Sequence, residues 1–236
     1  MARSKHTRPP AVLAASRVRA PYEPRRAGDA SARYALARAL KDLGIVAPPA
    51  EPSPDRGPSE PAPLPRLRAT RPRAGYSHPA SKADIASVLR FFGERCSYGL
   101  RSIELVRGDR APAGERLLLG ALLVPGRIVL YDQPPSPWLL PGRLAGGEQE
   151  MLRRAGASVE LVGGGSQTVV SWPGATLRDF MLFDVLMHEV GHHLIQQYKG
   201  KRRARVARTR DHEAFTDGFA RRCRRLYRGG GQAGSR

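Results

Sequence analysis

Apolar residues recur at helical spacing in the segment from residue 176 to about residue 199. The apolar positions are Phe180, Phe183, Met187, Val190, Leu194 and Tyr198. Intervals of three and four residues place these side chains on one face of an α-helix. Thr176 and Asp179 match the spacing of a capping box, and Gly200 follows the last apolar position. The pattern predicts an amphipathic helix that begins at Thr176 and ends near Lys199.

The same periodicity predicts three other helices. Residues 81–95 begin with Ser81 and Asp84 in a capping box, and their apolar positions form one stripe. Residues 211–227 also carry one apolar face, and residues 148–155 form a shorter helix. These helices lie between strand-like segments, so the chain is expected to belong to the α+β class.

Runs of β-branched and aliphatic residues predict strands. The strand-like segments are 102–107, 117–124, 127–131, 158–162 and 168–172. Pro125 and Gly126 separate the second from the third, and three glycines separate the last two, so each of these pairs is expected to form a hairpin. Residues 132–147 are rich in Pro and Gly and are predicted to form a long loop.

The N-terminal third of the chain has a different composition. Fourteen of the 21 prolines lie in residues 1–80, together with many Arg and Ala and few large apolar side chains. Such a segment buries too little apolar surface to offset the entropy of ordering it. Residues 1–80 are therefore predicted to be a disordered tail with at most a short helix at 31–43, residues 81–228 a folded domain, and residues 229–236 a disordered C-terminus.

The chain is strongly basic, with a net charge of +19 and an isoelectric point near 11.2. The charge predicts affinity for nucleic acid or another polyanion through Arg-rich segments, unless Arg merely occupies ordinary exposed surface. The two cysteines are too few for a disulfide framework, which favours a reducing compartment. No segment is apolar enough to cross a membrane or to act as a signal peptide. A cytoplasmic location is expected, with an Arg-rich organelle transit peptide as the alternative.

His188, Glu189 and His192 form an H-E-x-x-H pattern within the predicted helix of residues 176–199. Residues four apart on a helix project from the same face, so the two imidazoles can bind one zinc ion at about 2 Å each. Glu189 is rotated by about 100° from His188, so its carboxylate can address a water molecule beside the metal. The pattern predicts two histidine ligands and Glu189 as general base. The neighbouring His193 is expected to be an ordinary structural histidine.

A third protein ligand is expected, because catalytic zinc is usually held by three side chains and water. Glu213 and Asp217 lie four apart on one face of the next predicted helix. Glu213 can complete the coordination, and Asp217 can accept a hydrogen bond from the second ring nitrogen of His188. His212 is the alternative third ligand, since only one of two neighbouring residues can face the metal. An ordinary solvated helix face would also explain both carboxylates.

The two motifs together resemble those of the gluzincin metallopeptidases, in which H-E-x-x-H on one helix is followed by E-x-x-x-D or a similar pattern on the next. The segment from Glu213 to Ala220 is similar to the Glu-helix of compact, minigluzincin-like members and of the cytosolic ImmA/IrrE-like peptidases, with Thr216 at the usual small position. The resemblance covers residues 81–228 in element order. It implies a zincin-like fold, in which a small mixed or antiparallel sheet packs on the H-E-x-x-H helix and the following Glu helix.

This resemblance implies a zinc-dependent metallopeptidase with one Zn²⁺ ion and a protein or peptide substrate. Glu189 would take a proton from the zinc-activated water and later protonate the leaving amine. An exposed edge strand would bind an extended peptide by main-chain hydrogen bonds, and residues 127–131 are the candidate.

Two other functions fit the same residues. A SprT-like peptidase acts on DNA-bound proteins and uses a third histidine, which would make His212 the ligand and give the Arg-rich segments a role. A non-catalytic, basic zinc-binding adaptor would use the metal only for structure, although structural sites usually have four protein ligands and are rich in Cys. The identity of the substrate and the oligomeric state do not follow from the sequence.

Overall fold

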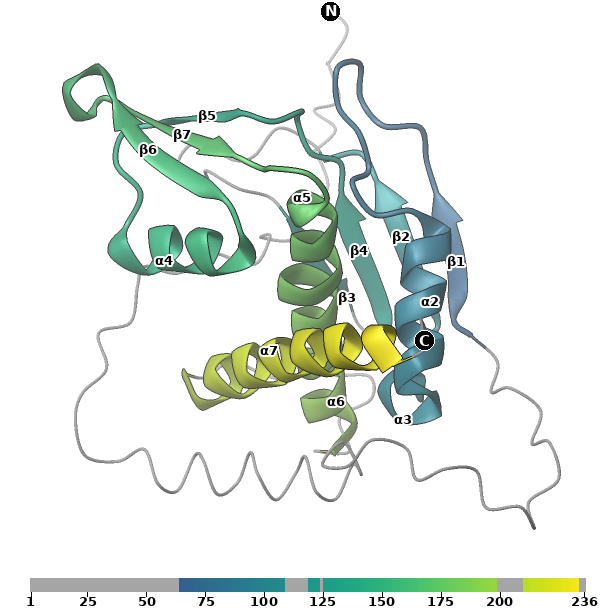
Figure 1. The fold of residues 1–236 in the computed structure, drawn as a ribbon. Coiled ribbons are helices and arrows are strands. Elements are labelled where there is room, and N and C mark those ends of the chain that lie inside the picture. Colours follow the sequence, from purple (N-terminus) through teal and green to yellow (C-terminus); the bar gives the residue numbers. More distant parts are fainter. Residues whose placement is uncertain (1–63, 109–118, 124, 199–209, 234–236) are drawn as a thin grey trace, which may run out of the picture.

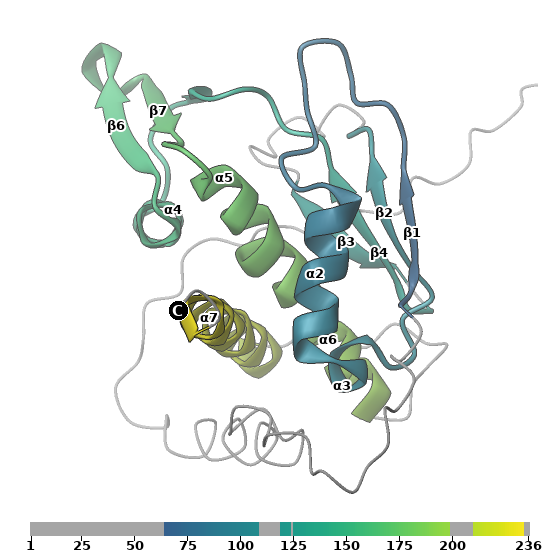
Figure 2. The same ribbon diagram turned by 45° about the vertical axis from the view of Figure 1, so that its right-hand side comes forward.

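A computed structural model describes residues 64–108, 119–123, 125–198 and 210–233, which form an α+β fold with two small sheets. Figures 1 and 2 show one layer of helices against the first sheet and the long C-terminal helix on the far side of that layer. The predicted helix at 31–43 lies outside the described residues. Within the described part of the chain, no helix has the length and apolar character needed to cross a membrane.

The first sheet is mixed and has the strand order β1-β2-β4-β3. Strands β1 (Arg66–Ala69), β2 (Ser102–Val106) and β4 (Arg127–Tyr131) are parallel, and β3 (Gly120–Leu123) runs antiparallel to β4. The hairpin predicted across Pro125 is confirmed. Alternate residues of β2 and β4 belong to the main apolar core, namely Ile103, Leu105, Ile128 and Leu130.

The predicted start of the folded domain at residue 81 is wrong, because β1 lies before it. Arg66 and Arg68 of this strand are exposed, and only Leu67 packs against the core. Asp132, which is fully buried at the end of β4, accepts hydrogen bonds from the backbone and side chain of Arg73 at 2.7 and 3.1 Å. The fold therefore begins before residue 81. Strand β1 is a short edge strand with two exposed arginines, so its sequence lacks the apolar alternation by which a strand can be predicted.

The second sheet is antiparallel and has the order β5-β7-β6. Its strands are β5 (Trp138–Pro141), β6 (Ser158–Val162) and β7 (Gln167–Ser171), and α4 (Gly146–Ala155) precedes β6. The β6–β7 hairpin agrees with the sequence prediction. The loop predicted at 132–147 is wrong in part, because it contains β5. Trp138 and Leu140 face inward there, but four residues among prolines and glycines are too few to show a period.

Helix α2 (Lys82–Phe92) covers the first sheet and is followed by the short α3 (Glu94–Ser97). Its capping box is present as predicted, since the Ser81 hydroxyl accepts from the Asp84 backbone at 3.1 Å and Asp84 accepts from the Ser81 backbone at 2.8 Å. The buried side of α2 packs on β1 and on residues 180–186, the segment directly before the helix that carries the H-E-x-x-H motif.

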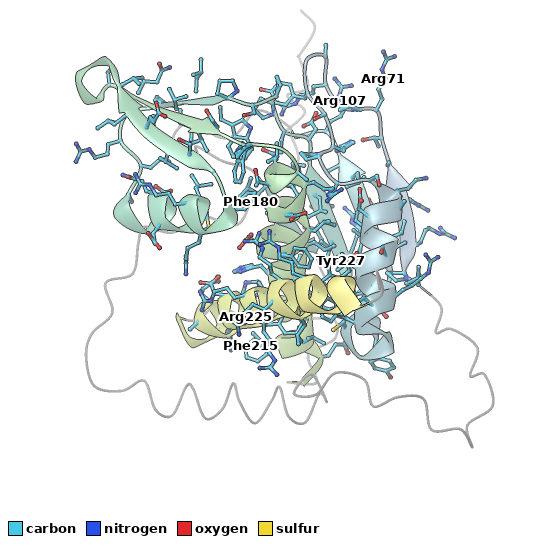
Figure 3. All side chains as sticks on the ribbon, in the orientation of Figure 1. Arg71, Arg107, Phe180, Phe215, Arg225 and Tyr227 are labelled. Atoms are coloured by element: carbon cyan, nitrogen blue, oxygen red, sulfur yellow. The ribbon has the colours of Figure 1, made fainter. Side chains whose placement is uncertain are left out.

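The predicted helix at 176–199 is present as three consecutive pieces: α5 (Thr176–Asp179), the π-helical segment η2 (Phe180–Leu186) and α6 (Met187–Tyr198). The capping box predicted at Thr176 is wrong, because Ala175 occupies the cap position and the Thr176 hydroxyl donates to the carbonyl of Pro173 at 2.7 Å. The apolar side of η2 is buried, and Phe180 lies in the core beneath α5 (Figure 3).

Helix α7 (Arg210–Ala233) packs across η2 and α6 on the side away from the sheet. The prediction that residues 229–236 are disordered is wrong for residues 229–233, which continue this helix; residues 234–236 lie outside the described range. Three residues of α7 are buried in the core, namely Phe219, Ala220 and Cys223. The helix thereby carries Glu213 and Asp217 to the H-E-x-x-H motif.

Candidate metal centre

The two motif histidines occupy successive turns of α6 and direct their Nε2 atoms toward each other. The two Nε2 atoms are 3.1 Å apart, and the rings meet edge to face with centroids 4.8 Å apart. His192 is buried and His188 is partly buried, so the two nitrogens converge at the edge of the core rather than in open solvent.

Glu213 brings its carboxylate to the same point from the first turns of α7. Its Oε2 lies 3.4 Å from Nε2 of His188, and its Oε1 lies 3.5 Å from Nε2 of His192. Zinc bonds of about 2.0–2.1 Å in a tetrahedron separate neighbouring donor atoms by about 3.3–3.4 Å. The separations of 3.1, 3.4 and 3.5 Å, the last two to different oxygens of Glu213, are close to this spacing. One ligand atom from each of the three side chains lies within 4.8 Å of the other two, so together they could hold one metal ion.

A close contact between α6 and α7 makes this convergence possible. A Cβ atom at Gly191 would stand 3.0 Å from Cγ2 and 3.2 Å from Cα of Thr216, so only glycine permits the present helix separation. Thr216 is fully buried, its hydroxyl donates to the carbonyl of Glu213 at 2.9 Å, and its Oγ1 is 3.5 Å from Nε2 of His188. Neither residue was singled out as a site residue from the sequence, although an isolated glycine inside a helical pattern is a signal of close packing.

Asp217 lies on the other side of the His188 ring. Its Oδ1 is 3.1 Å from Nδ1 of His188. A proton on Nδ1 donated to this carboxylate would leave the lone pair on Nε2, which faces Glu213 and His192. Asp217 therefore lies where it can orient the ring of His188.

The charges of these groups make the site favourable for a cation. Burial opposes the charged form of His188, but hydrogen bonds to Asp217 and Glu213 outweigh it and raise the pKa of His188 to about 9. Burial likewise opposes ionisation of Glu213, but both imidazoles hold the pKa of its carboxyl far below the usual range. The site favours positive charge, in the form of a proton or of a metal ion that replaces it.

Glu189 is buried, follows His188 in α6, and is hydrogen-bonded to the first sheet. Its Oε2 accepts a hydrogen bond from the backbone N–H of Leu122 in β3 at 2.8 Å. The negative charge of Glu189 contributes to the raised pKa of His188. The prediction that residues 127–131 form the exposed edge strand is wrong, because β4 lies between β2 and β3. The edge strand beside the site is β3. Its backbone contact with Glu189 has no signature in the sequence.

Two other histidines near the motifs lie outside this group of donors. His212 is described by the structure but does not belong to the group of His188, His192 and Glu213. His193 is fully buried on another side of α6, where its Nε2 is 2.9 Å from the carbonyl of Tyr98, so it serves the packing of the core. The geometry favours Glu213 over His212 as the third donor.

No family model, no curated protein and no solved structure matches the chain in the three comparisons.

Proposed function

We propose that the chain is a zinc-dependent hydrolase that cleaves peptide bonds, with His188, His192 and Glu213 as metal ligands and Glu189 as general base. The convergence of the three donors at distances that fit a tetrahedral ion carries the proposal. Three protein ligands leave one position of a tetrahedron for water or substrate, which is the arrangement of catalytic rather than structural zinc.

Bound zinc would supply a Lewis acid that lowers the pKa of water and polarises a substrate carbonyl. Glu189 would accept the proton from the attacking water and later donate it to the leaving amine. The hydrogen bond from the backbone N–H of Leu122 holds one oxygen of Glu189 in place. Asp217 would keep His188 in the tautomer with a free Nε2 lone pair.

The edge of β3 supports a peptide as the substrate. The N–H of Tyr131 bonds the carbonyl of Leu119, so the alternation of an antiparallel ladder directs the backbone groups of Gly120 and Leu122 away from β4. The contact of Leu122 with Glu189 shows that this outward edge runs along the site. An extended peptide that pairs with β3 would place a main-chain carbonyl near Glu189.

The two alternatives have less support from the geometry. A SprT-like set of ligands requires a third histidine, and the described donors converge with Glu213 instead of His212. A structural zinc site requires a fourth protein ligand, and the group found among the described residues has three members. Neither arrangement explains why the buried Glu189 is held beside the donors.

Zinc content and peptide hydrolysis of the full chain test the proposal. Wild type is expected to hold one zinc ion and to cleave a denatured protein or an unstructured peptide. Glu189→Gln should retain zinc and lose activity, and Glu213→Ala should lose zinc, whereas His212→Ala should change neither. Zinc retention without hydrolysis in both wild type and Glu189→Gln would leave only a structural site, and absence of zinc from wild type would refute the proposal.

A further inference from the structure

Helix α7 also contributes two arginines to a cluster of ion pairs that is separate from the metal centre. Glu213, Asp217, Arg224 and Arg228 are separated by four, seven and four residues, which places them within an arc of about 60° on a helix with 100° per residue. The two carboxylates meet His188 and the motif, while the two guanidinium groups meet the preceding helix. One stripe of α7 therefore contacts both the metal site and an ion-pair site about two turns away.

The ion-pair site consists of Arg224 with Asp184 and of Arg228 with Asp179. Arg224 pairs closely with Asp184, and only 12% of the Arg224 side chain and 17% of the Asp184 side chain are exposed. Arg224 also donates to the carbonyl of Asp179 at 3.3 Å, and Arg228 pairs with the Asp179 carboxylate at 3.0 Å. The Arg224–Asp184 pair is mostly shielded from water, so it is directional and little screened by salt.

The π-helical segment explains why both aspartates face α7. Five residues in a regular α-helix correspond to a rotation of about 500°, so Asp179 and Asp184 would point about 140° apart. A π-helix bonds each residue to the fifth one along, so five residues make close to one turn. The segment η2 begins directly after Asp179 and contains Asp184, and both carboxylates reach arginines of α7. The π-helical segment thus brings Asp179 and Asp184 to the same side, where both can pair with arginines of α7.

We propose that Arg224 and Asp184 are positioning residues that fix the rotation of α7 about its own axis and thereby hold Glu213 and Asp217 at the metal centre. The inference rests on the metal site of the proposed function. It assigns to the ion pair a role in metal binding that differs from a general contribution to stability.

Rotation of α7 displaces the carboxylate of Glu213 because this carboxylate lies far from the helix axis. Side-chain ends lie about 5–6 Å from a helix axis, so a rotation of about 10° displaces the carboxylate by about 1 Å. Metal–ligand distances tolerate only about 0.2 Å. The hydrophobic effect that buries Phe219 and Cys223 is not directional, whereas a guanidinium–carboxylate pair has a preferred geometry. The shielded Arg224–Asp184 pair is therefore a contact that can fix the angle.

The test uses the full chain and measures its zinc dissociation constant by competition with a chromophoric chelator. The main variant is the double substitution Asp184→Asn with Arg224→Met, which removes both charges and leaves neither one buried without a partner. We expect zinc to bind about tenfold more weakly or worse, as for other groups that orient metal ligands. The absorption bands of the Co²⁺-loaded variant should move toward those of Glu213→Ala. Arg224→Lys, which keeps the charge, should recover part of the affinity.

Two controls separate positioning from stability. Leu226→Ala shortens a partly buried side chain of α7 and should lower the melting temperature without changing the zinc affinity. Arg225→Met removes an exposed charge from the same helix (Figure 3) and should change neither. Wild-type zinc affinity in the double variant would overturn the inference while leaving the proposed function intact. Equal weakening in Leu226→Ala would also overturn it, and a wild type that takes up no zinc would overturn both.

If the double variant fails to fold, Arg228→Met, at the more exposed end of the site, is expected to weaken zinc binding by a smaller factor, and an unchanged affinity there would overturn the inference.

Discussion

The contact between Gly191 and Thr216 allows zinc affinity to be changed with little change in stability. In Gly191→Ala, the added Cβ would stand 3.0 Å from Cγ2 and 3.2 Å from Cα and Cβ of Thr216. Carbon atoms in ordinary contact are about 3.5–4.0 Å apart. Thr216 and helix α7 must therefore move away from α6 by a few tenths of an ångström, and Glu213 moves with them.

The effects on stability partly cancel. Overpacking of this kind costs about 1–3 kcal/mol, and replacing a glycine inside a helix with alanine stabilises the helix by about 1 kcal/mol. A displacement of Glu213 by a few tenths of an ångström is at or above the tolerance of a metal site, which is about 0.2 Å. We expect the free energy of unfolding to fall by at most about 2 kcal/mol and the zinc dissociation constant to rise on the order of tenfold to a hundredfold, as for other displaced supporting groups.

Urea unfolding of the chelator-treated protein and competition with a chromophoric chelator measure the two quantities. Gly146→Ala is the matched control, because a Cβ at this first position of α4 meets nothing within 4 Å. Thr216→Ser removes Cγ2, the nearest of the three atoms, and in combination with Gly191→Ala should restore part of the affinity. If Gly191→Ala binds zinc as tightly as wild type, the close helix contact does not position Glu213, and the reasoning is wrong.

Three further results are expected. Asp217→Ala should weaken zinc binding by about 10–100-fold, measured by the same competition, because Nδ1 of His188 loses the carboxylate that orients the ring; unchanged affinity would assign Asp217 to the solvated face. In chelator-treated protein the pKa of His188 is raised from 6.5 to about 9, so its contribution to stability is present below about pH 6.5 and is lost as the pH rises toward 9; His188→Ala should lack this slope in urea unfolding. Asp132→Ala should destabilise the fold by about 1–3 kcal/mol, because the buried backbone N–H of Gly108 loses its acceptor and the partly exposed Arg73 loses its ion-pair partner; an unchanged free energy of unfolding would contradict their place in the fold.

The elements with a long, regular pattern were predictable from the sequence. The helix of residues 176–198 and the β3–β4 and β6–β7 hairpins show full periods or clear turn residues. Strands β1 and β5 have four residues each, among arginines or prolines, and so carry no readable period. The boundary at residue 81 and the loop at 132–147 were wrong for this reason.

In the candidate site, the residues that follow from helix spacing were predictable from the sequence, and the contacts between elements were not. His188, Glu189 and His192 follow from spacing on one helix, and the pairing of Glu213 with Asp217 follows from spacing on the next. Contacts between elements do not have such a signature. The hydrogen bond from Leu122 depends on which strand forms the sheet edge, and the Arg224–Asp184 pair depends on a π-turn that no spacing rule for α-helices predicts.

An anomalous diffraction map from crystals of the zinc-loaded full chain, measured at the zinc absorption edge, would show which side chains hold the ion. One strong peak per chain is expected, at about 2.0–2.2 Å from Nε2 of His188, Nε2 of His192 and a carboxylate oxygen of Glu213. A peak coordinated by His212 in place of Glu213, or no peak between the two motif histidines, would contradict the proposed metal site.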